Sequence, residues 1–126
     1  MSDKATILAV DDTSESLALL VELLTPAGYR VHAADSGELA LAAVAVSPPD
    51  LILLDVRMKG LDGLEVCRRL KANEETRHIP IILISAFADV KEWVAGLQMG
   101  AADYIPKPLQ AEEPGAGGLQ GGSNGS

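Results

Sequence analysis

Cysteine is almost absent from this chain of 126 residues, because Cys67 is its only cysteine. An intrachain disulfide is therefore impossible, and there is no cysteine pair at the CxxC spacing of a metal site. Cys67 falls on the inner side of a predicted helix, which indicates a small core residue and not a reactive thiol. The cysteine content thus favours a reducing, cytoplasmic setting.

Basic residues and long apolar runs are also scarce. Lysine and arginine number 10 against 18 aspartates and glutamates, so the net charge is -8. Direct binding to nucleic acid needs a basic face, and we therefore expect none from this chain. The longest unbroken apolar run covers residues 39–46, whereas a membrane-spanning helix needs ~18 apolar residues. Because the charged start also argues against a signal peptide, we expect a soluble protein with no membrane contact.

What the sequence does contain is an alternation of short apolar runs with helical patterns. The runs are continuous, as in strands buried on both faces, and predict strands over residues 7–10, 29–33, 51–54, 80–84 and 102–105. Helical spacing between them predicts four helices, which begin near Thr13 or Ser14, Asp35 or Ser36, Asp62, and Val90. The length allows a single domain, and the pattern predicts an α/β fold with a doubly wound parallel sheet.

Two of these helices carry more specific signals. Asp62 and Glu65 have the spacing of a capping box, and Val90, Val94 and Leu97 form the apolar stripe of the last helix. After Leu109 the apolar periodicity stops. Residues 110–126 are rich in glycine, which indicates a flexible linker or an artificial extension. We therefore assign the domain to residues 1–109 and the tail to residues 110–126.

Five polar residues follow directly on the predicted strands: Asp11, Asp12, Asp55, Ser85 and Lys107. The carboxyl ends of parallel strands meet at one edge of a sheet, where open α/β folds bind their ligands. Clustered carboxylates repel one another unless a cation neutralises them, and oxygen ligands suit Mg²⁺, for which Mn²⁺ can substitute.

The same cluster has the parts needed for phosphoryl transfer. The carboxylate of Asp55 can attack a phosphoryl donor to give an acyl phosphate, Lys107 can supply a fixed cation, and the Ser85 hydroxyl can donate to a phosphoryl oxygen. Taken singly, an Asp-Asp pair is usually a solvated turn, a lysine a structural ion pair, and a strand-end serine a partner of its own backbone. Their convergence at the ends of neighbouring strands favours the chemical interpretation.

These residues lie in a set of motifs that resembles the response-regulator receiver domain of two-component signalling. The resemblance covers about residues 5–109. Its most specific stretches are residues 7–12 (ILAVDD), 50–58 (DLILLDVRM), 60–66 (GLDGLEV) and 96–108 (GLQMGAADYIPKP).

The resemblance implies a flavodoxin-like five-stranded sheet of order 2-1-3-4-5 and a phosphorylation-dependent switch. In that family the residue at Asp55 accepts the phosphoryl group from a histidine kinase or phosphotransfer protein, and Lys107 pairs with this group. Ser85 and Tyr104 correspond to the switch pair that reports phosphorylation.

In the same family, Mg²⁺ is held at the positions of Asp12, Asp55 and the backbone carbonyl of Arg57, with Asp11 acting mostly through water. Such a domain is not an enzyme on other substrates, and it works with an output domain or a homodimer partner. The bond between Lys107 and Pro108 is expected to be cis.

The sequence also departs from the family pattern. Lys59 stands where proline is usual, so the loop after Asp55 is expected to be looser. Pro106 and Leu109 replace a small hydroxyl residue and a phenylalanine, and the usual fifth helix is missing or replaced by the glycine-rich tail. We therefore expect the surface that includes this helix, through which the family commonly binds partners, to differ in this chain.

Several other side chains have open roles. Arg57 and Phe87 correspond to positions that border the path of the hydrolytic water, and their bulk is expected to slow dephosphorylation; the alternative for Phe87 is simple packing. His32 and His78 are expected to be solvated and not ligands. Trp93 lies off the apolar stripe and is either a half-exposed packing residue or an interface anchor.

Three alternatives to this function are weighed. A haloacid dehalogenase-type phosphohydrolase expects an acid two residues after a nucleophile on the first strand, where Thr13 and Ser14 stand instead. A flavodoxin expects a glycine-rich phosphate loop, and residues 12–15 (DTSE) are acidic and lack glycine. The third alternative is a receiver-like module that binds proteins without phosphate, which the retained phosphorylation residues disfavour but do not exclude.

Overall fold

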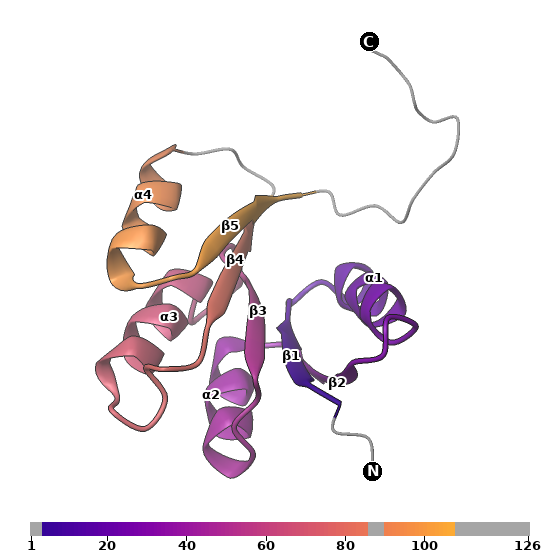
Figure 1. Cartoon of the computed structure of the whole chain (residues 1–126). Coiled ribbons are helices and arrows are strands. Elements are labelled where there is room, and N and C mark those ends of the chain that lie inside the picture. The colour runs from indigo at the N-terminus through magenta and orange to yellow at the C-terminus, as the bar shows by residue number, and fades with distance from the viewer. Residues whose placement is uncertain (1–3, 86–89, 108–126) are drawn as a thin grey trace, which may run out of the picture.

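The computed structural model describes residues 4–85 and 90–107, and it is built from alternating strands and helices (Figure 1). The elements in chain order are β1 (Thr6–Val10), α1 (Ser14–Leu24), β2 (Arg30–Ala34), α2 (Gly37–Val46), β3 (Leu51–Asp55), α3 (Gly63–Ala72), β4 (Ile81–Ser85), α4 (Val90–Met99) and β5 (Asp103–Pro106). All strand pairs are parallel and the order is β2-β1-β3-β4-β5. The predicted fold class and strand order are confirmed.

The sheet is covered differently on its two faces. In Figure 1, α2, α3 and α4 lie on one face and α1 lies on the other. The first face has the larger apolar cluster, which includes Leu54, Val66 and Leu83. The second has a smaller one around Ile7, Leu20 and Ile84. The central strands β1, β3 and β4 are mostly buried and need no polar alternation, which is why they appeared as continuous apolar runs, whereas the edge strands β2 and β5 are more exposed.

The helix starts follow the predicted capping chemistry in part. Ser36 caps α2 by accepting a hydrogen bond from the Leu39 amide at 3.1 Å, and Asp62 caps α3 by accepting from the Glu65 amide at 2.9 Å. In a full capping box the Glu65 side chain would also bond back to the Asp62 amide, but Glu65 makes other contacts. Its carboxylate pairs with Arg68 and Arg69, whose guanidinium groups lower the pKa of Glu65 to about 2.

The apolar stripe predicted for α4 does not pack on the sheet. Val90, Val94 and Leu97 are 63 %, 43 % and 42 % exposed, and only Gly96 of this helix is buried. A Cβ atom built on Gly96 would lie 2.3 Å from Cδ1 of Leu83, so α4 approaches β4 through this glycine. The close approach turns the apolar stripe toward solvent.

Some expectations fall outside the described residues. They concern Phe87, the bond from Lys107 to Pro108, Leu109 and the glycine-rich tail. The missing fifth helix and the domain boundary at residue 109 lie outside the described residues as well. Among the helices that the structure describes, none has the length and apolar content to cross a membrane.

Candidate phosphoacceptor site

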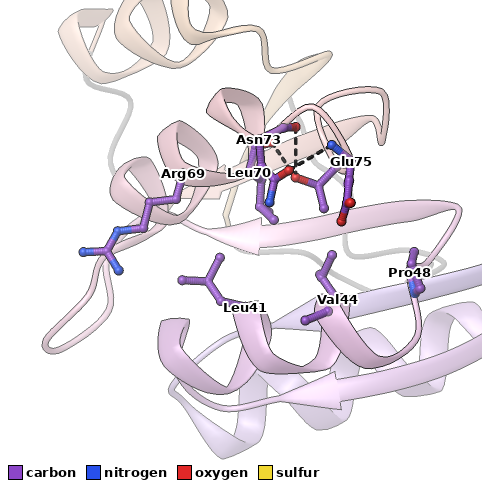
Figure 2. A pocket seen from close by; sticks show the side chains of 9 residues that line it. Leu41, Val44, Pro48, Arg69, Leu70, Asn73 and Glu75 are labelled. Carbon is purple, nitrogen blue, oxygen red and sulfur yellow. Dashed lines mark hydrogen bonds between the residues drawn. The ribbon is translucent and has the colours of Figure 1, made fainter.

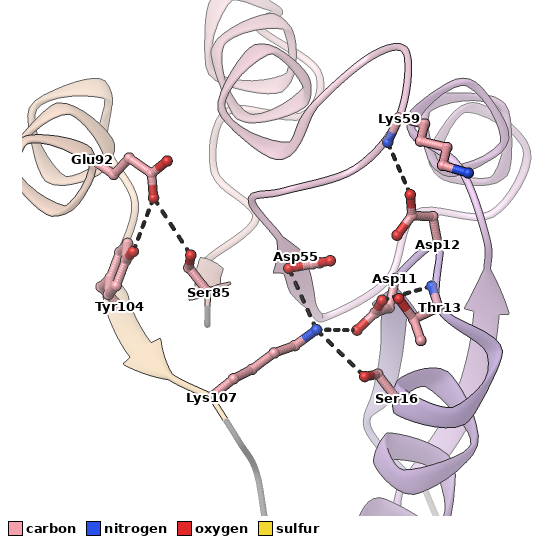
Figure 3. A network of polar contacts seen from close by, with 10 residues as sticks. All are labelled: Asp11, Asp12, Thr13, Ser16, Asp55, Lys59, Ser85, Glu92, Tyr104 and Lys107. Carbon is pink, nitrogen blue, oxygen red and sulfur yellow. Dashed lines mark hydrogen bonds and ion pairs between the residues drawn. The ribbon is translucent and has the colours of Figure 1, made fainter. Parts of the chain in front are cut away.

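The predicted site residues meet at the carboxyl edge of the sheet (Figure 3). Asp11 follows β1, Asp55 ends β3 and Ser85 ends β4, and each is at most 4 % exposed. Lys107 follows β5, where its backbone amide donates to the carbonyl of Ser85 at 2.7 Å. Three buried polar residues at one edge are costly unless they are paired, which makes this edge the chemical centre of the molecule.

Lys107 is the cation of the cluster. Its Nζ atom lies 2.8 Å from Oδ2 of Asp11 and 3.6 Å from Oδ1 of Asp55. A third contact, of 3.5 Å, reaches Oγ of Ser16. In this state the ammonium is therefore bound mainly to Asp11, within reach of Asp55.

Asp12 is positioned by the loop that follows Asp55. Its Oδ2 atom accepts a hydrogen bond of 2.9 Å from the backbone amide of Lys59. Proline could not make this bond, because it has no amide hydrogen. The Lys59 amide thus joins the loop after Asp55 to the end of the first strand, and the expectation that the loop is looser than usual stays a prediction.

The backbone of Asp55 is held by the start of α3. The Gly63 amide donates to the carbonyl of Val56 at 2.9 Å. A Cβ atom at Gly63 would lie 2.2 Å from the carbonyl oxygen of Asp55, so only glycine permits this contact. A helix pressed directly on the strand end fixes the position from which the Asp55 carboxylate projects.

The electrostatic balance of the site is dominated by negative charge. Burial raises the pKa of Asp55 to about 6, and the neighbouring Asp11 carboxylate adds to the rise, whereas Lys107 and the backbone amide of Arg57 oppose it. Asp55 is thus mostly ionised at neutral pH, but it binds a proton more readily than an ordinary aspartate. A strongly perturbed pKa within a cluster of charged groups is a feature of functional sites.

The three acids fit a divalent cation. Asp11, Asp12 and Asp55 each offer an oxygen atom, and these atoms lie within 4.8 Å of one another. Oxygen-only donors with room for water are the ligand set of Mg²⁺, and one ammonium does not neutralise three carboxylates. The chemistry of the donors, and not any bound group, is the basis for this assignment.

The predicted switch pair, Ser85 and Tyr104, adjoins the cluster and shares a partner that the sequence did not predict. Ser85 Oγ and Tyr104 Oη both donate to Oε1 of Glu92, at 3.4 Å and 3.3 Å (Figure 3). Arg57 Nε donates to the other oxygen of Glu92 at 2.6 Å. The helical spacing was a clue, because residues four and seven apart lie on one face of a helix. Glu92 precedes Gly96 by four residues and Met99 by seven, and both of these pack toward the core.

The other singled-out residues lie elsewhere. His32 and His78 are exposed, and Cys67 is a fully buried core thiol whose pKa is raised by burial. Trp93 is 47 % exposed, and its ring centroid is 6.3 Å from that of Tyr104. Trp93 is therefore half-exposed and packs beside Tyr104, and the alternative role as an interface anchor stays a prediction.

A cavity of about 290 Å³ lies between the carboxyl-terminal halves of α2 and α3 (Figure 2). Its polar lining groups serve the fold, because Thr76 Oγ1 donates to the carbonyl of Leu70 and Asn73 bonds the following turn. The ends of these helices lie at the opposite edge of the sheet from Asp55. This cavity is separate from the acidic cluster and brings no comparable chemistry together.

Comparison with known proteins matches this geometry. The family model described as the response regulator receiver domain matches residues 7–114. The response regulator PleD of Caulobacter vibrioides is 47 % identical over 105 residues, and the match covers 83 % of this chain and 23 % of PleD. The response regulator MprA of Mycobacterium leprae is 47 % identical over 107 residues, which cover 85 % of this chain and 46 % of MprA.

Solved structures agree with the sequence relatives. The N-terminal domain of a response regulator receiver protein from Methanoculleus marisnigri is 39 % identical to this chain. Its superposition has a TM-score of 0.78 and covers 84 % of this chain and 86 % of that domain. This chain spans between about a quarter and a half of the length of the two curated relatives above.

Proposed function

Because this chain belongs to the family of response regulator receiver domains, we propose that Asp55 accepts a phosphoryl group from a histidine kinase or a phosphotransfer protein. Membership in the family makes the chain a phosphorylation-dependent signalling switch in general terms. The observation that supports Asp55 as the acceptor is its place: a buried carboxylate of raised pKa between two further acids and a lysine.

In the proposed reaction, an ionised oxygen of Asp55 attacks the phosphorus of a phosphohistidine. The new O–P bond gives an acyl phosphate, and the P–N bond breaks so that its electron pair returns to the imidazole. Lys107 Nζ, 3.6 Å from Asp55, moves from Asp11 toward the incoming group and balances the charge on its oxygens. Water later hydrolyses the acyl phosphate and resets the switch.

Mg²⁺, or Mn²⁺ in its place, would be held by Asp12, Asp55 and the backbone carbonyl of Arg57, with Asp11 acting through water. When bound, such a cation offsets the repulsion between carboxylates and phosphoryl oxygens. The chain contributes a fixed carboxylate arrangement: Lys59 orients Asp12, Lys107 and the Thr13 amide orient Asp11, and Gly63 fixes Asp55.

The proposed readout uses Ser85 and Tyr104. The Ser85 hydroxyl turns toward the phosphoryl group, and the Tyr104 ring moves into the space that this turn opens. Both residues adjoin α4, so the change reaches the exposed surface of that helix.

The proposal includes no activity on any other substrate. The two curated relatives above are longer than this chain, and an output domain or a second receiver copy is therefore the proposed recipient of the signal. With a net charge of -8, the chain is proposed to act through protein contacts and without direct binding to nucleic acid.

The test is metal-dependent phosphorylation by a small donor. The protein is incubated with phosphoramidate or acetyl phosphate with and without Mg²⁺, and its intact mass is recorded. We expect the gain of one phosphoryl group with Mg²⁺, no gain for Asp55→Ala, and an unchanged gain for Asp103→Ala. Asp103 is a suitable control because it is an exposed aspartate at the start of β5.

A folded protein that binds Mg²⁺ but gains no mass would contradict the proposal and favour the phosphate-independent binding module. A gain that persists in Asp55→Ala would place the acceptor on another residue.

A further inference from the structure

Glu92 is a carboxylate on the protein-facing side of α4, where the core of a helix contact is usually apolar. Its side chain is only 15 % exposed. The three groups that donate to it come from three different segments: Arg57 from the loop after β3, Ser85 from the end of β4, and Tyr104 from β5. We call these four residues the Glu92 network.

The contacts within the Glu92 network differ in strength. The ion pair with Arg57 is short, at 2.6 Å, whereas the two hydroxyl contacts of 3.3 Å and 3.4 Å are long for O–H···O bonds. Hydrogen bonds to a charged group are nevertheless stronger than neutral ones. The geometry is thus one in which Arg57 anchors the carboxylate and the carboxylate restrains two hydroxyl groups weakly.

We propose that Glu92 is a positioning residue that favours the unphosphorylated arrangement by holding the hydroxyl groups of Ser85 and Tyr104. This inference rests on the proposed function of Asp55 and goes beyond it, because it assigns a role to a residue outside the acceptor site. The reason is a competition: Ser85 has one hydroxyl hydrogen, so when it donates that hydrogen to a phosphoryl oxygen it no longer donates it to Glu92.

The competition sets the sign of the effect. A ligand shifts a two-state equilibrium only through its different affinity for the two states. Loss of the Glu92 carboxylate removes an interaction that is present only in the unphosphorylated arrangement. The free energy of switching therefore falls, and a phosphoryl group or its analogue binds more tightly. Arg57 adds to the restraint because its ion pair holds the carboxylate in place over the hydroxyl groups.

The test measures the affinity of the protein for beryllofluoride, a phosphoryl analogue, by titration calorimetry with Mg²⁺ in excess. For Glu92→Ala we expect the dissociation constant to fall by about 2- to 10-fold, the range of one hydrogen bond. Glu92→Gln keeps an acceptor oxygen and should fall between the wild type and Glu92→Ala. Glu22→Ala, which removes an exposed carboxylate of α1, should leave the affinity unchanged.

A double-mutant cycle separates positioning from a general effect on folding. Tyr104→Phe removes one of the two hydroxyl groups, so the affinity gain from Glu92→Ala should shrink in that background. Equal or weaker binding by Glu92→Ala than by the wild type overturns the inference.

Failure of the proposed function gives a different result. If the wild type binds no beryllofluoride, the acceptor site is at fault, and the Glu92 network is then judged in the metal-free protein. There, the change in urea midpoint of the double variant should differ from the sum of the changes that Glu92→Ala and Tyr104→Phe each cause. Additive changes, together with Trp93 fluorescence in Glu92→Ala that equals that of the wild type, overturn the inference, because Trp93 lies beside Tyr104 and reports its position.

Discussion

Two helices on the same face of the sheet, α3 and α4, are attached in very different ways. Four residues of α3 are buried, namely Gly63, Val66, Cys67 and Leu70, whereas α4 buries Gly96 alone. The start of α3 is pressed on the backbone of Asp55. By contrast, α4 presents its apolar stripe to solvent and reaches the site through the polar contacts of Glu92. The α3 side of the site is fixed by close packing, whereas the α4 side is held by long hydrogen bonds to Glu92.

This difference gives a physical account of how a small change at Asp55 could reach the surface. Segments with few buried apolar contacts open at a lower free energy than the core and are the parts that move in switching. In the proposed switch, the anchored helix α3 keeps Asp55 in place and the weakly attached helix α4 responds. The comparison can be tested at three levels, from stability to charge to motion.

The largest expected effect comes from truncating the same side chain on each helix. Leu70→Ala on α3 should lower the free energy of unfolding by about 2–5 kcal/mol, because Leu70 is 4 % exposed and its loss leaves a cavity. Leu97→Ala on α4 should change it by less than about 0.5 kcal/mol, because Leu97 is 42 % exposed. Urea denaturation of both variants measures the difference. Similar losses in the two would break the comparison.

A smaller effect is expected from the charge of Asp55. Its pKa is about 6 in the folded protein, above the value of 3.8 for a free side chain. Between these values the folded state holds a proton that the unfolded state has lost, so stability falls as pH rises from about 4 to 6. Asp55→Asn cannot titrate. It should therefore be more stable than the metal-free wild type by about 1–3 kcal/mol at pH 8, with little difference near pH 4.

Denaturation curves at pH 4, 6 and 8 in the presence of a chelator measure this gain. Asp103→Asn provides the control, because that carboxylate is exposed and lies at the opposite edge of the sheet. A variant Asp55→Asn that is no more stable than the wild type at pH 8 would show that Lys107 already compensates the three carboxylates.

Local rules were sufficient to predict the strands and the acidic cluster, whereas the strand order was predicted from the family resemblance. Buried parallel strands require continuous apolar runs, and the residues that follow them must meet at one edge. Asp11, Asp12, Asp55, Ser85 and Lys107 are brought together as predicted. Their chemical roles remain predictions.

The orientation of α4 could not be obtained in the same way. Its periodicity predicted an apolar stripe, but the face that packs on the sheet is set by the close approach of Gly96 to Leu83, which lies on another element. The same tertiary contact turns Glu92 inward. Likewise, the hydrogen bond from the Lys59 amide to the Asp12 carboxylate joins residues 47 positions apart, so no local pattern in the sequence predicted it.

The most direct measurement of the central claim is hydrogen exchange of the protein with and without beryllofluoride and Mg²⁺, followed by mass spectrometry of peptides from α3 and α4. The account predicts faster exchange in α4 than in α3 before addition, and a change on addition that is concentrated in α4 and β5. Exchange that changes equally in both helices, or only in α3, would contradict it.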